Sequence, residues 1–280
     1  MEIIVAKTAG FCFGVKRAVD MAFEHENKLG TYTYGPIIHN EVVIKSLEEK
    51  GIKAIEAMDE ENINKLIIRS HGVSPKVYHQ GEEKGIEIVD ATCPYVKKIH
   101  RYVEKYYKNG YGIIIAGNKD HPEIQGINGW ANEACFIVKD REALKEISFN
   151  KSGQKYLLVA QTTYKKQVVD EILAALKEEG IDVEYINTIC NATKERQEEV
   201  VEIAKQVDVM LVLGSAKSSN SLKLFELSQK HCVNSYFIGE ASELKRELFE
   251  NCNKVGVTAG ASTPNSVIQD VIAFIANMNY

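Results

Sequence analysis

The sequence predicts an α/β fold of three similar small α/β units, because one pattern of residues occurs three times along the chain. In each copy a cysteine precedes an amphipathic helix, which leads into a short apolar strand that ends at a glycine. The cysteine-to-glycine intervals are 23, 24 and 24 residues, and a polar side chain follows each glycine by four positions. Three copies of one unit predict a pseudo-threefold arrangement in which each unit presents one thiol. The cysteine–glycine pairs are Cys12 and Gly35, Cys93 and Gly117, and Cys190 and Gly214.

The helix after each cysteine is predicted from apolar residues that recur at the spacing of one helical face. Each predicted helix leads into a short apolar run, and such alternation is typical of buried parallel strands in βαβ units. The apolar stripes are Val15, Ala18, Val19 and Ala22; Tyr95, Ile99, Tyr102 and Tyr106; and Val200, Ile203, Ala204 and Val207.

Two strands are expected in each unit, and polar loops follow them. The first strands are expected at residues 32–34, 113–115 and 209–213, and the second strands with their loops at 67–72, 157–163 and 255–262. Ligands of open α/β sheets bind beyond the carboxyl ends of the strands, so these loops predict a polar pocket beside the thiols. The pocket residues are His39, His71, His121, Thr162, Ser218 and Ser262.

The predicted domains follow the repeat, since no Pro/Gly/Ser-rich linker or low-complexity tract separates them. We expect a first unit at residues 14–93, a second at 94–187, and a third at 188–280 joined by residues 1–13.

Composition narrows the class of protein. The chain has 280 residues, 45% hydrophobic and 26% charged, which is ordinary for a globular protein. A net charge of -5 without a Lys/Arg run argues against nucleic-acid binding, and no apolar stretch approaches the 18 residues of a membrane span. The N-terminus lacks the features of a signal peptide, so a cytoplasmic location is expected and the six cysteines are expected to be reduced thiols or metal ligands.

The repeated setting of Cys12, Cys93 and Cys190 favours a metal cluster over the alternative that they are small buried hydrophobes. A helix start suits an anionic cluster because the positive end of the helix dipole lies there. Zinc sites commonly use close CxxC pairs, which are absent, so three distant thiols favour an iron–sulfur cluster. Three ligands leave one iron of a four-iron cluster open to act as a Lewis acid on a substrate oxygen. The remaining cysteines, Cys135, Cys232 and Cys252, lie outside the repeat and are assigned no role.

The loop His121-Pro122-Glu123 places an imidazole and a carboxyl group side by side. Glu123 is interpreted as a proton donor for chemistry that expels a hydroxyl, and the alternative is an acid favoured by the dipole in a helix's first turn. Thr162 is expected to bond the ligand or Glu123 and to relay a proton, unless it only caps its strand.

The run Ser218-Ser219-Asn220-Ser221 is predicted to open a helix, where Ser and Asn are common N-caps. A helix start with several hydroxyls is also an anion site. With His39, His71 and Ser262 as further donors, these residues are expected to hold a phosphate or diphosphate without clustered lysines.

These motifs resemble the 4-hydroxy-3-methylbut-2-enyl diphosphate reductase family, which acts last in the methylerythritol phosphate pathway of isoprenoid synthesis. The matching segments run in order over nearly the whole chain, so the resemblance is highly specific. They are AGFCFGVKRAVD at 9–20, YGPIIHN at 34–40, RSHGVSP at 69–75, DATCPYVKKIH at 90–100, HPEIQG at 121–126, QTT at 161–163, TICNATKERQ at 188–197, GSAKSSNS at 214–221 and TAGASTP at 258–264.

The resemblance implies a trefoil of three α/β domains around a [4Fe-4S] cluster held by Cys12, Cys93 and Cys190. It implies an allylic diphosphate substrate, removal of its hydroxyl with two electrons and two protons, and isopentenyl and dimethylallyl diphosphates as products. It also implies a ferredoxin or flavodoxin as electron donor, and Glu123 as proton donor working with Thr162. The residues implied to bind the diphosphate are His39, His71, Ser218, Ser219, Asn220 and Ser262, with His121 near both the diphosphate and the hydroxyl.

Two other functions remain open on the residues alone. One is a three-cysteine iron–sulfur dehydratase or quinolinate-synthase-like lyase, which needs no net electrons. The other is an iron–sulfur sensor without turnover, against which the His121-Pro122-Glu123 loop and the phosphate-suited helix start both argue.

Overall fold

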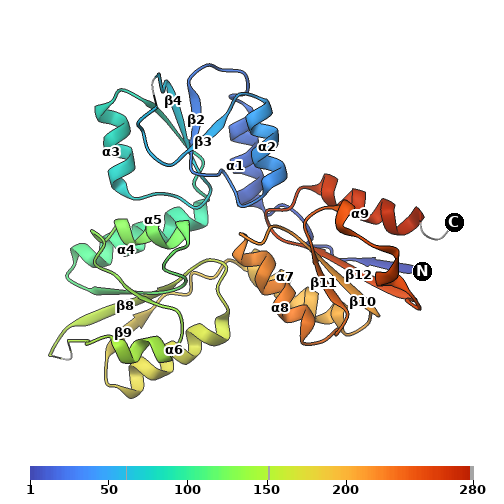
Figure 1. Ribbon diagram of the computed structural model, residues 1–280. Helices are drawn as coiled ribbons and strands as arrows, with labels where there is room; N and C mark the ends of the chain where they lie inside the picture. The colour runs from blue at the N-terminus through green and yellow to red at the C-terminus, as the bar shows by residue number, and fades with distance from the viewer. Residues whose placement is uncertain (61, 151, 278–280) are drawn as a thin grey trace. The chain divides into compact units, whose positions relative to one another are not determined.

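Three four-stranded sheets, all parallel, make up the strands of the computed structural model, which describes residues 1–60, 62–150 and 152–277 (Figure 1). The first sheet runs β3 (Lys53–Ile55), β2 (Thr31–Tyr34), β4 (Lys65–Ile68), β5 (Glu87–Asp90). The second runs β7 (Phe136–Val138), β6 (Gly112–Ala116), β8 (Lys155–Ala160), β9 (Asp182–Tyr185). The third runs β11 (Ser235–Ile238), β10 (Val209–Leu213), β12 (Lys254–Ala259), β1 (Glu2–Val5). The expected α/β class with three small parallel-sheet units is confirmed.

The third sheet takes its edge strand from the start of the chain. β1 pairs with β12 in parallel, from Glu2 opposite Lys254 to Val5 opposite Val257. In this way β1 fills the place that β5 and β9 fill in the other two sheets. The domain boundaries expected from the repeat stay a prediction.

Nine α-helices and three short 3-10 helices connect these strands within the described residues (Figure 1). The α-helices are α1 (Phe13–Phe23), α2 (Glu41–Glu49), α3 (Pro75–Glu83), α4 (Pro94–Lys108), α5 (Pro122–Gly129), α6 (Lys166–Glu178), α7 (Asn191–Ala204), α8 (Ser219–Gln229) and α9 (Asn265–Asn277). The 3-10 helices are η1 (Glu142–Glu146), η2 (Ala241–Glu243) and η3 (Arg246–Phe249). None of the described helices is both long and apolar enough to cross a bilayer.

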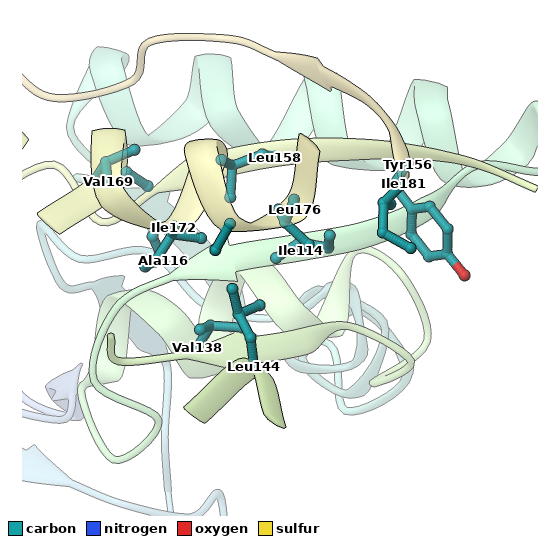
Figure 2. Packing of buried hydrophobic residues seen from close by; sticks show 12 residues of the cluster. Ile114, Ala116, Val138, Leu144, Tyr156, Leu158, Val169, Ile172, Leu176 and Ile181 are labelled. Carbon is teal, nitrogen blue, oxygen red and sulfur yellow. The ribbon is translucent and has the colours of Figure 1, made fainter. Parts of the chain in front are cut away.

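The second sheet shows why its strands are continuous apolar runs. Successive side chains of a strand point to opposite faces, and both faces of this sheet are covered. Ile114 and Leu158 pack with α6, as Figure 2 shows, whereas Ile113 and Leu157 pack with Ile99 of α4 on the other face. Every residue of β6 after its first is fully or almost fully buried.

All six expected strands are present, but two helical stripes need correction. In α4 the buried face is formed by Val96, Ile99 and Val103, and Tyr95 is 50% exposed. Tyr102 and Tyr106 lie beside this face, and their long side chains reach the core from there. Val207 lies beyond the end of α7 and packs with the core from the following loop.

The repeated glycines end their strands in the same way. Each donates its backbone N–H to the last carbonyl of the neighbouring strand. At Gly117 a Cβ atom would lie 2.6 Å from the Ile124 side chain, and at Gly214 it would lie 2.3 Å from the Ser221 hydroxyl. At these two positions glycine is therefore required because the next helix packs directly against the strand end, whereas at Gly35 a Cβ atom would lie 2.2 Å from the Arg69 side chain.

Candidate active site

The predicted site residues belong to two compact bodies of the chain, and the geometry of each body is described by itself. The terminal body comprises residues 1–16, 38–46 and 191–280, and the central body comprises residues 17–37 and 47–190. The terminal body holds Cys12, His39, Ser218, Ser219, Asn220 and Ser262. The central body holds His71, Cys93, His121, Glu123, Thr162 and Cys190.

The three repeated cysteines share one backbone setting. Each lies directly before a helix, and each donates its backbone N–H to a carbonyl two residues beyond the end of a strand, which is β12 for Cys12, β4 for Cys93 and β8 for Cys190. Pro94 occupies the first turn of α4, as expected from its fixed φ angle. The three bonds run from Cys12 to Ala261 (3.2 Å), from Cys93 to Ser70 (2.9 Å) and from Cys190 to Thr162 (3.0 Å).

Two arginines hold the loops that carry these cysteines. Arg17 donates to the carbonyl of Thr92, immediately before one cysteine, at 3.3 Å. Arg196, which is buried, donates to the carbonyl of Gly10, two residues before another, at 2.8 Å. Neither contact follows from local sequence, since each joins residues at least 75 positions apart.

The donor set fits an iron–sulfur cluster. The side chains of Cys12, Cys93 and Cys190 are half-buried, which suits ligands that must be both reachable and partly shielded. Cys135 provides a contrast, because burial raises the pKa of its thiol to about 12 and keeps it protonated. A protonated thiol is a poor metal ligand, so Cys135 is unsuited to be a sulfur donor.

Glu123 is a carboxylic acid of the central body with a strongly raised pKa. It lies in the first turn of α5 with only 2% of its surface exposed. Desolvation raises the pKa of its carboxyl group to about 7, against two hydrogen bonds from Thr162 that lower it. The backbone N–H of Thr162 donates to Oε1 at 2.6 Å and its hydroxyl donates to Oε2 at 2.7 Å. The group therefore exchanges its proton near neutral pH.

His121 is the N-cap of α5 and is oriented by Glu123. Its Nδ1 accepts the backbone N–H of Glu123 at 3.2 Å, which assigns the ring proton of the neutral imidazole to Nε2. His71, in the loop after β4, packs edge-on against His121 with ring centroids 5.4 Å apart. The structure thus brings His71, His121, Glu123 and Thr162 of the prediction together within the central body.

The terminal body contributes a cluster of hydroxyls at the start of α8. Ser218 caps the helix by accepting the backbone N–H of Ser221, and the Ser221 hydroxyl donates to Ser218 at 3.0 Å. Ser262 lies 3.3 Å from the Ser218 hydroxyl and also donates to the carbonyl of His39 at 3.1 Å. Ser219 follows the cap as the first residue of the helix. Hydroxyls at a helix N-terminus form an environment that suits an anion.

Asn220 adds an unusual feature to this cluster. Its side chain is buried, with 4% exposed, yet neither atom of its amide group has a hydrogen-bond partner among the described residues. A buried polar group without a partner costs free energy, roughly 1–3 kcal/mol. A ligand at the start of α8 would supply the missing partner.

Two residues of these elements were absent from the sequence prediction. The sequence places Ser221 only in the predicted helix start, whereas in the structure its hydroxyl donates to the hydroxyl of Ser218. Asn40 precedes α2 and caps it, because its side chain accepts the backbone N–H of Val43 at 3.2 Å. The preference of Asn for the N-cap position could have identified Asn40 from the sequence.

Comparison with known proteins agrees with this architecture. The Caldanaerobacter subterraneus protein named 4-hydroxy-3-methylbut-2-enyl diphosphate reductase is 46% identical, over 99% of this chain and 98% of the relative. The reductase of the same name from Clostridioides difficile is 42% identical over 99% of this chain and all of the relative. The solved structure of the E-1-hydroxy-2-methyl-but-2-enyl-4-diphosphate reductase from Plasmodium falciparum matches with a TM-score of 0.92 at 32% identity, covering 99% of this chain and 88% of that one.

The fold and these relatives define an oxidoreductase of the non-mevalonate isoprenoid pathway, built on three parallel sheets. More particularly, the chain belongs to the LytB protein family, whose pattern matches residues 3–276. The family resemblance read from the sequence motifs is confirmed.

Proposed function

We propose that this protein reduces 4-hydroxy-3-methylbut-2-enyl diphosphate to isopentenyl and dimethylallyl diphosphates. The allylic C–O bond breaks, and the oxygen leaves as water after taking up one proton. Two electrons enter the allyl fragment, and a second proton adds to one of its two end carbons, which accounts for two products. An external reductant supplies both electrons and is itself oxidised.

Cys12, Cys93 and Cys190 would hold a [4Fe-4S] cluster. When bound, this group supplies electrons and a Lewis-acidic iron that no protein thiol occupies. Support comes from the identical backbone setting of the three cysteines at helix starts, where the dipole favours an anionic centre.

Glu123 carries the proposal, because an acid with a pKa of about 7 delivers a proton at neutral pH. The Thr162 hydroxyl donates to the ionised carboxylate and can accept from the protonated acid. The hydrogen bond between them therefore survives both protonation states, and the hydroxyl can relay the proton to the leaving oxygen. His121 and His71 are proposed to bind the substrate beside this acid.

The diphosphate is proposed to bind at the start of α8. Ser218, Ser219 and Ser262 offer hydroxyl donors there, and the unpartnered amide of Asn220 supports this choice. His39 and His71 would add imidazole donors. The helix dipole favours the negative charge of the ligand.

The electron donor is proposed to be a ferredoxin or a flavodoxin, and the location of the enzyme is proposed to be cytoplasmic. Support for an external donor comes from the reaction itself, since it consumes two electrons that the substrate does not carry.

The test is an anaerobic assay of the purified protein with 4-hydroxy-3-methylbut-2-enyl diphosphate and reduced methyl viologen, with iron and sulfide measured on the same sample. We expect oxidation of the viologen together with formation of both isoprenoid diphosphates. Product formed without any reductant would favour the lyase, and a full cluster without turnover would favour the sensor.

The cluster assignment is tested by substituting cysteines. Cys190→Ser is expected to lower the iron content sharply, whereas Cys232→Ser is expected to leave it unchanged because that thiol lies outside the repeated setting. Equal iron loss in the two variants would contradict the assignment.

A further inference from the structure

The helices that follow the three site cysteines differ in charge, although they begin in the same backbone setting. α4 carries five basic residues and one acidic residue. α7 carries two basic and four acidic residues, and α1 carries two basic and one acidic. The whole chain has a net charge of -5, so the basic character of α4 stands out against the rest of the molecule.

Three cations of α4 form one exposed row, which we call the basic stripe: Lys98, Arg101 and Lys105. Their spacing of three and four residues places them on one face of the helix. None of the three forms an ion pair with another described residue, whereas Lys97 pairs with Asp90 at 2.7 Å and Lys108 with Glu104 at 2.6 Å. Lys98 lies over the ring of Tyr102, 5.6 Å from its centroid.

The stripe begins close to a proposed cluster ligand. α4 starts directly after Cys93, and Lys98 is five residues further on. At about 1.5 Å of rise per residue, this is roughly 7 Å along the helix axis. The opposite face of α4 is packed in the core through Val96, Ile99 and Val103, so the helix holds the stripe on a rigid support.

We propose that the basic stripe of α4 is the docking surface for an acidic electron-carrier protein. This inference rests on the proposed function, which requires two electrons from outside the chain. Unpaired cations on one helix face attract a partner of opposite charge and accelerate its encounter by about 10- to 1,000-fold at low salt. The carrier is oxidised by one electron in each encounter, so two encounters supply one turnover.

The opposite charge of α7 gives the stripe its specificity. An acidic carrier is repelled by Glu195 and Glu202, which are on the helix that follows Cys190. Glu198 of the same helix is paired with Lys194 at 3.7 Å. Like charges brought together at an interface suppress binding in the wrong place. The carrier is therefore directed to the start of α4.

The test compares a protein donor with a small one. We would use an acidic bacterial flavodoxin as the probe, and methyl viologen, a small cation, as the donor that needs no docking. The variants are Lys98→Glu with Arg101→Glu, and Lys105→Glu alone in case the double change disturbs the helix. The control is Lys155→Glu with Lys177→Glu, which makes the same charge change at exposed positions in the same body, outside α4.

Two readouts are needed: flavodoxin binding by titration calorimetry, and turnover with each donor at low and high salt. We expect the double variant to lose about tenfold or more in flavodoxin binding and flavodoxin-driven turnover at low salt, with viologen-driven turnover unchanged. Lys105→Glu should show a smaller loss of the same kind, and the control none. High salt should remove the difference, since screening acts over about 10 Å at 0.1 M.

Several results would overturn the proposal. One is flavodoxin binding by both stripe variants as tight as that of the unchanged protein, and another is an equal loss in the control. If the stripe variants bind the polyanion heparin more weakly but bind flavodoxin as tightly as the unchanged protein does, the stripe is a site for a different polyanion. If the unchanged protein does not turn over with viologen, the proposed function is rejected instead. The docking proposal is still tested in that case, because the flavodoxin titration does not depend on turnover.

Discussion

The starts of α5 and α8 occupy the same place in two of the sheets but carry different chemistry. Each helix follows a repeated glycine, and each has a polar N-cap, His121 in α5 and Ser218 in α8. The second helical residue is buried in both, and it is Glu123 in one and Asn220 in the other. Glu123 has two protein donors, whereas the Asn220 amide has none among the described residues.

This difference supports the two roles proposed for these helix starts. Thr162 supplies hydrogen-bond partners to Glu123, which we propose as the proton donor. Asn220 has no such partner among the described residues, and we propose that the diphosphate supplies one. The backbone places the two side chains alike, and the loop from the neighbouring strand provides partners in one case only.

The largest expected effect comes from removing the acid. Glu123→Gln keeps the shape of the side chain and both contacts with Thr162, because the amide oxygen can accept the N–H and the amide nitrogen can donate to the hydroxyl. We expect turnover to fall roughly 100- to 10,000-fold, the range of general acid catalysis, with substrate binding retained. Single-turnover kinetics and a binding titration measure the two effects. Glu133→Gln, at an exposed residue, is the control, and turnover like that of the control would remove Glu123 from the mechanism.

The raised pKa of Glu123 also predicts how the free energy of unfolding depends on pH, and Glu123→Gln provides the comparison. The pKa of Glu123 in the folded protein, about 7, lies above its ordinary value of 4.5, so the folded state binds this proton more tightly than the unfolded state. The contribution is fully present below pH 4.5 and is lost as pH rises through about 7. Anaerobic urea unfolding at pH 5 and pH 8 should show that wild type loses more stability than Glu123→Gln, by at most about 3 kcal/mol. Equal losses would contradict the raised pKa.

An intermediate effect is expected at the other helix start. Asn220→Asp removes the amide donors and adds a negative charge, which should weaken binding of inorganic pyrophosphate roughly 10- to 100-fold. Because Asn220 is buried, the new carboxylate should also lower stability, and the helix dipole should offset part of that loss. Calorimetric titration and thermal unfolding check the two statements. Asn251→Asp, an exposed change in the same body, should leave pyrophosphate binding unaltered.

The smallest effect is expected from Thr162→Val, which keeps the backbone N–H bond to Glu123 but removes the hydroxyl. Loss of that hydrogen bond raises the pKa of Glu123 further, because the bond lowers it in the unchanged protein. The alkaline limb of the pH–rate profile should therefore move to higher pH, with turnover reduced roughly fivefold to tenfold at its maximum. Thr163→Val is the matched neighbour, and a profile that shifts equally in both variants would count against the specific contact.

Local sequence was sufficient for much of this structure. The central strands β6 and β10 are continuous apolar runs, and the helix after Cys93 begins at the expected proline. The hydrogen bond between Glu123 and Thr162 was among the expected contacts, because both residues lie on the polar loops expected after the two strands of the second unit.

Other features could not be predicted because distant residues determine them. β3 and β7 have only three residues each, too few for a recognisable alternation. The contacts of Arg17 with Thr92 and of Arg196 with Gly10 join loops that only the folded chain brings together. The burial that raises the pKa of Glu123 is likewise a property of the packed α5, since its sequence neighbours do not reveal how much water reaches the carboxyl group.

The pairing of β1 with β12 has a consequence for the order of assembly. The first strand to leave the ribosome has its partner some 250 residues later, so the third sheet closes only after residues near 259 have been synthesised. The loop that carries Cys12 depends on the same event, because its backbone bond ends on Ala261. Although Cys12 is the first cysteine of the chain, its backbone is thus fixed only after Ala261 has been synthesised.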